Sequence, residues 1–448
     1  MTTGRFSLRL YLSSAGVFAA ALVFALGACD DAIELSEEEY IERAQEHRLA
    51  GKLRASVIEL KNALQANPES APARWLLGQL YVDIGQGAAA EKELMRSRDL
   101  GMDGEALLKP LGRAWLLQGK FKPVLEEIAY QEHDEATTKA AVLVLHGLAR
   151  LGLGRPDEAE TAFREALEHD PEAAEAYAGL ARAALLRRDL DQAEAELARA
   201  GAIAPEDPDV LTVKGDVAFL RGDYAGSAAA FETLLKTRPD NLGLQIALAR
   251  AQIGTGNLEE AAANLDRVLK VIPNHPATNY LRALAAFRAE DYETAINYTE
   301  AVLRIDGSHL PSLLIAGAGS YALGRLEQAN KHLTRFLADV PGHRAARRLL
   351  GATQLRIGRA DEAVATLDPL LDGGDEEDAT LLAMIGTAAV RSGDLVAGSE
   401  YFQRAAALRP EAADIRTQLG LTRIALGQRE LGIEDLEQAI EIDPGLDR

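Results

Sequence analysis

The chain repeats itself every 34 residues, and this period restricts its possible folds more than any other feature. Aligned on itself, the 448-residue sequence contains twelve repeats, and two of the steps between them are 35 residues long. The repeats begin at Glu37, Ala71, Glu105, Ala140, Ala174, Pro208, Leu242, Pro276, Leu310, Arg344, Ala379 and Ala413. A period of this size is typical of solenoids, in which each repeat buries its apolar face only against its neighbours.

Two positions in the repeat favour small residues. Position 8 is Gly or Ala throughout, as at Gly78 and Gly420, and position 20 is small in most repeats, as at Ala90 and Gly432. Two helices approach each other closely only where the facing side chains are small. The pattern therefore predicts a pair of tightly packed antiparallel helices in each repeat.

Position 15 supplies the turn between the two predicted helices. It is Gly in ten of the twelve repeats, and Gly adopts a left-handed helix stop at the least cost. A proline closes eight repeats, among them Pro68 and Pro444, and proline cannot continue the preceding helix. Aromatic residues make up only 5% of the chain, which disfavours a β-sandwich or barrel. We therefore expect an all-α fold.

This framework of small residues, turn glycines and closing prolines covers residues 37–446 and resembles the tetratricopeptide repeat (TPR) family. The resemblance implies a solenoid of about twelve helical hairpins wound into a right-handed superhelix, in which the first helix of each hairpin lines a concave groove. We expect one continuous array over residues 37–448. Its weakest repeat is predicted near residues 105–139, where Pro123 interrupts the pattern.

The first 28 residues have the pattern of a bacterial signal peptide and not of a repeat. Two arginines precede an uncharged apolar run that ends in Leu26-Gly27-Ala28-Cys29, as secretory signals do. This end resembles the lipobox, whose cysteine thiol accepts a diacylglycerol, and Cys29 is the only cysteine in the chain. We predict a lipoprotein signal peptide over residues 1–28, a lipid on Cys29 and a short linker over residues 29–36. The alternative is an inert cysteine in an apolar segment.

Asp30 follows the predicted lipid site directly. In the lipoproteins of enteric bacteria that this leader resembles, Asp at that position retains the protein on the inner membrane. The predicted location is the periplasmic face of the cell envelope of a Gram-negative bacterium, with the inner membrane favoured and the outer membrane as the alternative. The membrane is then a partner through the N-terminal lipid.

The first three repeats carry a closer resemblance. The segments 57–65, 76–94 and 114–121 resemble the PEP-CTERM system TPR-repeat lipoprotein family, PrsT. Members of that family also begin with a lipobox and are encoded with exosortase and exopolysaccharide genes. The resemblance implies a role in exopolysaccharide export or in exosortase-linked sorting.

Charge and residue spacing exclude several other classes. The chain has 69 acidic and 48 basic residues and a net charge of −21, which repels a phosphate backbone, so we expect no nucleic-acid partner. The eight histidines show no metal-binding spacing, and no Gly-rich loop has the pattern of a phosphate-binding motif. The sequence predicts no catalytic residue, no metal site and no cofactor.

One candidate binding surface follows from the family resemblance. Positions 5, 9, 12 and 13 of the family's repeats tend to face the groove, and guanidinium groups there bind carboxylates in bidentate geometry. The candidate groove arginines are Arg113, Arg182, Arg250, Arg288, Arg348, Arg356 and Arg391, and the candidate aromatic anchors are Phe219, Phe287 and Tyr321. Such a groove suits an acidic peptide, a C-terminal carboxylate or an anionic polysaccharide. The alternatives are solvated arginines paired with nearby acids and aromatic rings that pack between repeats.

The leading functional prediction is a non-enzymatic, lipid-anchored periplasmic scaffold. It would bind envelope proteins or peptides in its groove and serve exopolysaccharide export or PEP-CTERM and exosortase-linked sorting. The alternative is an assembly lipoprotein of another envelope machine, such as alginate-type secretion, pilus biogenesis or outer-membrane protein assembly. No residue pattern favours an enzyme.

Overall fold

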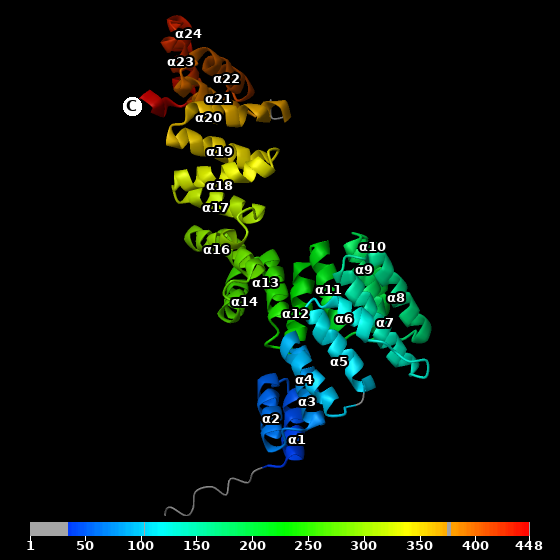
Figure 1. The fold of residues 1–448 in the computed structure, drawn as a ribbon. Helices are drawn as coiled ribbons and strands as arrows, with labels where there is room; N and C mark the ends of the chain where they lie inside the picture. Colours follow the sequence, from blue (N-terminus) through cyan, green and yellow to red (C-terminus); the bar gives the residue numbers. More distant parts are fainter. Residues whose placement is uncertain (1–34, 103, 374–377, 448) are drawn as a thin grey trace, which may run out of the picture. The chain divides into compact units, whose positions relative to one another are not determined.

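The computed structural model describes residues 35–102, 104–373 and 378–447. The predicted signal peptide over residues 1–28, the predicted lipid site Cys29 and most of the linker after it lie outside the described residues. Within the described ranges the chain forms 24 α-helices and two short 3-10 helices, with no strand (Figure 1). The expected all-α class is confirmed.

The helices form two compact units that divide the chain between residues 153 and 154. The first unit contains α1 (Glu37–Leu49), α2 (Leu53–Ala66), α3 (Ala71–Asp83), α4 (Gly87–Asp99), α5 (Gly104–Leu117), α6 (Phe121–Glu127) and α7 (Ala136–Gly152). The boundary falls between the two helices of the fourth repeat. The continuity of the array over residues 37–448 therefore stays a prediction.

The second unit begins with α8 (Pro156–His169), the second helix of the fourth repeat. The first helices of the later repeats are α9 (Ala174–Leu186), α11 (Pro208–Arg221), α13 (Leu242–Thr255), α15 (Pro276–Arg288), α17 (Leu310–Ala322), α19 (Arg344–Ile357), α21 (Ala379–Ser392) and α23 (Ala413–Ala425). The second helices are α10 (Leu190–Ile203), α12 (Tyr224–Thr237), α14 (Leu258–Val271), α16 (Tyr292–Ile305), α18 (Leu326–Asp339), α20 (Ala360–Leu367), α22 (Leu395–Leu408) and α24 (Arg429–Ile442). Figure 1 shows α16 to α21 following one another as successive layers.

The helix starts agree with the period of the sequence. In ten of the twelve repeats the first helix begins at the predicted residue. Many of these starts have a local cause: Asp207 caps α11, whose first residue is Pro208, and the Asn241 side chain accepts a hydrogen bond from the backbone N–H of Leu244 at 3.1 Å. Such side chains satisfy the donors that a helix N-terminus leaves unpaired.

The turn after each first helix takes a left-handed residue. All ten glycines at repeat position 15 have positive φ, for example 82° at Gly222. The two repeats without Gly there keep the same conformation, with φ of 62° at Arg188 and 59° at Glu290. The hairpin geometry thus requires this conformation even where the residue type opposes it.

The small residues at position 8 lie where the two helices of a hairpin are closest, as predicted. A Cβ atom on Gly351 would come within 2.4 Å of the Leu367 side chain, and one on Gly420 within 2.8 Å of the backbone oxygen of Gly432. Position 8 of one helix therefore packs against positions 20 and 24 of the other. A larger residue at position 8 cannot enter without moving the second helix.

The hairpins of repeats 3 and 10 depart from the regular pattern. The second helix of repeat 3, α6, has only seven residues, where most second helices have 13 or 14. Pro123 lies inside this short helix. In repeat 10, α20 has eight residues and continues into a 3-10 helix, η1 (Asp368–Gly373). A second 3-10 helix, η2 (Pro444–Asp447), follows α24.

Within the second unit, the first helices form a shared face in two stretches, α9 with α11 and α13 to α23. Successive first helices contact one another in the pairs α9 with α11, α13 with α15, α15 with α17, α17 with α19, α19 with α21 and α21 with α23. No two successive second helices make a comparable contact in the described part of the chain. The hairpins are therefore closer together along their first helices, and we call this side the first-helix face.

Candidate functional site

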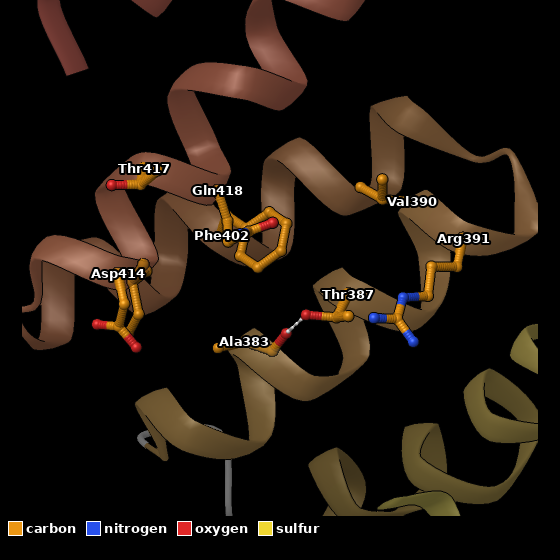
Figure 2. Close-up of a pocket in the computed structure, with 9 residues that line it drawn as sticks. Ala383, Thr387, Val390, Arg391, Phe402, Asp414, Thr417 and Gln418 are labelled. Carbon is orange, nitrogen blue, oxygen red and sulfur yellow. Dashed lines mark hydrogen bonds between the residues drawn. The ribbon is translucent and has the colours of Figure 1, made fainter. Parts of the chain in front are cut away.

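A pocket of about 440 Å³ lies on the first-helix face between α21 and α23. Its α21 residues occupy repeat positions 5, 9, 12 and 13, the positions that the sequence analysis assigned to a binding groove. It is lined by Ala383, Thr387, Val390 and Arg391 from α21, Phe402 from α22, and Asp414, Ile415, Thr417 and Gln418 from α23. Figure 2 shows Arg391 and Asp414 on opposite sides of this group.

The lining of this pocket combines an apolar base with polar edges. Phe402 is 1% exposed, and Gly386 lets its ring approach α21 because a Cβ atom there would be 3.1 Å from it. The Thr387 hydroxyl donates to the backbone oxygen of Ala383 at 2.8 Å, so that hydroxyl is used within its own helix (Figure 2). Asp414 lies in the first turn of α23, where the helix dipole favours a carboxylate.

Three of the predicted groove arginines are ion-paired. Arg182 lies 3.2 Å from Asp209, and Arg250 lies 3.1 Å from Asp216. Arg348 pairs at 2.5 Å with Asp378, the N-cap residue of α21. A fourth, Arg113 on α5 in the first compact unit, is also engaged in an interaction.

Repeat position 9 of three consecutive repeats carries alternating charges, at Arg182, Asp216 and Arg250. Burial raises the pKa of the Asp216 carboxyl above its ordinary value, and the two arginines act in the opposite direction. Because opposite charges follow one another along the face, this stretch holds its repeats together electrostatically and does not form a basic stripe.

The other three predicted arginines contact no carboxylate of the residues that the structure describes. Arg288 donates to the backbone oxygen of Ile253 at 2.8 Å, and Arg391 donates to that of Leu355 at 3.1 Å. Arg356 lies over the Tyr321 ring at 4.9 Å. All three occupy repeat position 13, and each contacts position 12 of the preceding repeat. We call Arg288, Arg356 and Arg391 the position-13 row.

The predicted aromatic anchors are all engaged within the protein. Phe219 lies under the Arg250 guanidinium at 4.2 Å and 5.2 Å from the Tyr224 ring. Phe287 packs against Tyr292 at 5.5 Å between ring centroids. The structure thus brings Arg250 to Phe219 and Arg356 to Tyr321. Whether any of these residues binds a ligand stays a prediction.

A recurrent contact between the second halves of successive repeats was not predicted from the sequence. In three pairs of successive repeats a carboxylate at repeat position 25 contacts position 23 of the next repeat. The contacts are Asp266 with Tyr298 at 3.4 Å, Glu300 with His332 at 3.2 Å, and Asp368 with Tyr401 at 3.0 Å. Its sequence pattern is an acid followed about one period later by Tyr or His. This pattern occurs in too few repeats to be distinguished from other exposed polar residues.

The fold and this geometry define a class, the solenoids built from helical hairpins. Models of the tetratricopeptide repeat match residues 48–109, 150–217, 218–285, 320–385 and 413–446, which is more than half of the chain. The chain belongs to the tetratricopeptide repeat family, whose arrays generally bind partner proteins. A model of anaphase-promoting complex, cyclosome, subunit 3 also matches residues 254–336. No curated protein matches the chain.

Several solved structures are similar to parts or all of this chain. Pseudomonas aeruginosa pilF is 20% identical, with a TM-score of 0.41, over 46% of this chain and 94% of that chain. PilW, a type IV pilus biogenesis factor, is 20% identical with a TM-score of 0.43 over 47% and 98% of the two chains. A chain of the Cut9–Hcn1 hetero-tetramer is 16% identical with a TM-score of 0.34 over 96% of both chains.

Among the described residues, no three His, Cys, Asp or Glu side chains are grouped so that they could hold a metal ion. None of the described helices is both long enough and apolar enough to cross a membrane.

Proposed function

We propose that this chain is a non-enzymatic scaffold that holds components of a bacterial envelope system together through its first-helix face. The observation that carries the proposal is the construction of that face. The first helices from α13 to α23 contact one another in succession, and a pocket of about 440 Å³ lies between α21 and α23 at the groove positions. A row of six contacting helices with a recess between two of them suits an extended segment of a partner protein.

We further propose that the array is held at the periplasmic face of the envelope by a lipid on Cys29. The support is the apolar leader that ends in Leu26-Gly27-Ala28-Cys29 and contains the chain's single cysteine. Asp30 after the lipid site favours the inner membrane. A single lipid chain gives only marginal anchoring, whereas the two acyl chains of a diacylglycerol anchor stably.

The system served is proposed to be exopolysaccharide export or PEP-CTERM and exosortase-linked sorting. The resemblance of the segments 57–65, 76–94 and 114–121 to the PrsT lipoproteins supports this choice. An assembly lipoprotein of alginate-type secretion, pilus biogenesis or outer-membrane protein assembly is the alternative.

Affinity capture from detergent-solubilised envelope tests the proposal, with wild type compared with Cys29→Ala. We expect the wild type to recover polysaccharide-export or exosortase components and the variant to lose them together with its membrane association. Recovery of pilus or outer-membrane assembly proteins would move the chain to the alternative class. Unchanged membrane association of Cys29→Ala would refute the lipid anchor.

A further inference from the structure

The second helices of the first two repeats carry an exposed charge opposite to that of the whole chain. On α2, Arg54, Ile58 and Lys61 are exposed at spacings of four and three residues, which places them on one face of the helix. On α4, Lys92 is exposed at the repeat position of Ile58, and Arg96 is exposed one turn later. The chain as a whole has a net charge of −21. We call these five residues the basic patch.

The carboxylates of α2 and α4, both of which the structure describes in full, do not neutralise the basic patch. Three of them pair with cations outside it: Glu59 with Arg43 at 3.0 Å, Glu93 with Arg74 at 2.7 Å and Glu91 with Lys120 at 2.6 Å. Asp99 is the one exposed carboxylate on these two helices. Among the described residues, Lys61, Lys92 and Arg96 have no carboxylate partner, whereas Arg54 is engaged in an interaction.

The first helix of the same hairpin carries the opposite charge. The exposed carboxylates of α1 are Glu38, Glu39, Glu42 and Glu46. Its one exposed cation, Arg43, is paired with Glu59. Ala44 of α1 joins Leu53 and Leu60 of α2 in one apolar cluster, so the exposed sides of the two helices lie away from this shared core. The first hairpin therefore combines an acidic helix with a basic one, and an external field favours one orientation of such a pair.

Second helices farther along the chain do not share the charge of the basic patch. The exposed charges of α8 are Asp157, Glu158, Glu165 and Glu168 against Arg164, and those of α24 are Glu430, Glu434, Glu437 and Glu441 against Arg429. The reversal of charge in α2 and α4 thus occurs in the repeats that follow the predicted lipid site most closely.

The distance along the chain from the predicted lipid site to the first hairpin is short. α1 begins at Glu37, eight residues after Cys29. Eight residues span at most about 26–29 Å when fully extended, so a lipid on Cys29 would keep the start of α1 within that distance of the bilayer. Anionic lipids make the bilayer surface negative, and its field extends over a Debye length of about 8–10 Å. A rotation of the first hairpin is enough to bring the basic patch into this field.

We propose that the basic patch rests on the anionic surface of the bilayer that holds the anchor. This inference rests on the proposed lipid anchor and adds a second contact, between the folded array and the membrane. The four cations lie against the lipid headgroups. Ile58, which is 58% exposed, lies among them and is removed from water by the contact. α1 and its carboxylates then lie on the side of α2 that faces away from the lipid.

A bilayer is favoured over a soluble polyanion as the occupant of the basic patch. The anchor holds the bilayer next to the first hairpin and so gives its surface a high effective concentration there. A free polyanion has no such tether and is repelled by the net charge of −21 on the chain.

The test measures how close the basic patch lies to a bilayer. The full chain is coupled through Cys29, its only cysteine, to a maleimide-bearing phospholipid in vesicles, so that anchoring does not depend on lipidation in the cell. A fluorescent residue replaces Ile58 or, as a comparison, Glu42 on α1, and nitroxide-labelled headgroups quench its fluorescence on contact. Vesicles of phosphatidylcholine alone are compared with vesicles that also contain phosphatidylglycerol.

Two variants separate the basic patch from the net charge of the chain. The patch variant is Lys61→Gln, Lys92→Gln and Arg96→Gln together. The matched control is Lys270→Gln, Arg304→Gln and Lys331→Gln, which removes the same charge from exposed positions of α14, α16 and α18. Circular dichroism checks that both variants keep the helix content of the wild type.

We expect stronger quenching at position 58 than at position 42 in vesicles with phosphatidylglycerol, and weaker quenching at position 58 in phosphatidylcholine alone. Each basic residue near an anionic surface strengthens the contact by about fivefold. The patch variant should therefore lower the ratio of membrane-apposed to free chains by about tenfold or more, whereas the control variant should leave this ratio unchanged.

Three results would overturn the inference: equal quenching at the two positions, quenching at position 58 that does not depend on phosphatidylglycerol, or an equal loss in both variants. Release of the basic patch from the bilayer by a polyuronate oligosaccharide at physiological salt would assign it to a soluble polyanion and would also overturn the inference. Each of these results leaves the lipid anchor standing, because the membrane association of Cys29→Ala in cells decides that question separately.

Discussion

The left-handed residues Arg188 and Glu290 give the sharpest test of the hairpin geometry. Both take positive φ in a turn where the other ten repeats use glycine. Neither side chain makes a hydrogen bond or ion pair with any residue in the described ranges. A non-glycine residue in this conformation costs about 1–2 kcal/mol of folding free energy, and glycine removes this strain. Glycine in turn loses about 0.5–1 kcal/mol, because it has more conformational freedom in the unfolded chain. Arg188→Gly and Glu290→Gly should therefore each stabilise the protein by about 0.5–1 kcal/mol.

The assay is urea unfolding followed by circular dichroism, with the transition midpoint compared between variants. The matched controls are Arg188→Ala and Glu290→Ala, which remove the same long side chain but keep the Cβ atom that causes the strain. We expect the glycine variants to unfold at higher urea than wild type and the alanine variants to remain close to it. If the glycine and alanine variants shift equally, or if glycine destabilises, the turn does not impose the strain inferred here.

Three further outcomes follow from the structure. Gly351→Ala places a methyl group 2.4 Å from the fully buried Leu367 side chain. It should therefore destabilise the fold by about 1–3 kcal/mol in urea unfolding, and an unchanged stability would show that α20 shifts without energetic cost. Burial lowers the pKa of His332 below its ordinary value of 6.5, and Glu300 only partly opposes this shift. As the pH falls, this imidazole therefore takes up a proton in the unfolded chain before it does so in the folded chain. The stability of the fold should decrease as the pH drops below about 6.5. His332→Gln should lose this part of the pH dependence between pH 7.5 and 5, and an unchanged profile would contradict it. Tyr401→Phe removes the hydrogen bond to Asp368 and should lower the free energy of unfolding by about 0.5–1 kcal/mol in the same assay. An unchanged free energy of unfolding would mean that this contact does not stabilise the fold.

The period and its small residues predicted the hairpins because both are local requirements. Position 8 must be small wherever two helices cross at contact distance, so a glycine there, as at Gly351 or Gly420, predicts the close packing of the two helices. The turn at position 15 was equally clear in ten repeats. In the other two repeats the left-handed turn could not be predicted from Arg188 or Glu290, because the tertiary packing of the hairpin overrides the backbone preference of these residues.

The candidate site could be predicted only in part, because a repeat register gives the face on which a side chain lies but not its partner. The sequence placed Arg182 and Arg288 in one set. The structure separates them: Arg182 has Asp209 of the next repeat within reach, while Arg288 reaches only the backbone of the previous one. That difference depends on the offset between neighbouring hairpins, which a one-dimensional pattern does not contain.

Site-specific photo-crosslinking in the native envelope tests whether partners bind the first-helix face. A photoreactive residue replaces Gln418, which is exposed and lines the pocket, or Lys331, which is exposed on the second helix α18. We expect a discrete crosslinked partner protein from position 418 and none from position 331. A partner crosslinked from position 331 and absent from position 418 would contradict it.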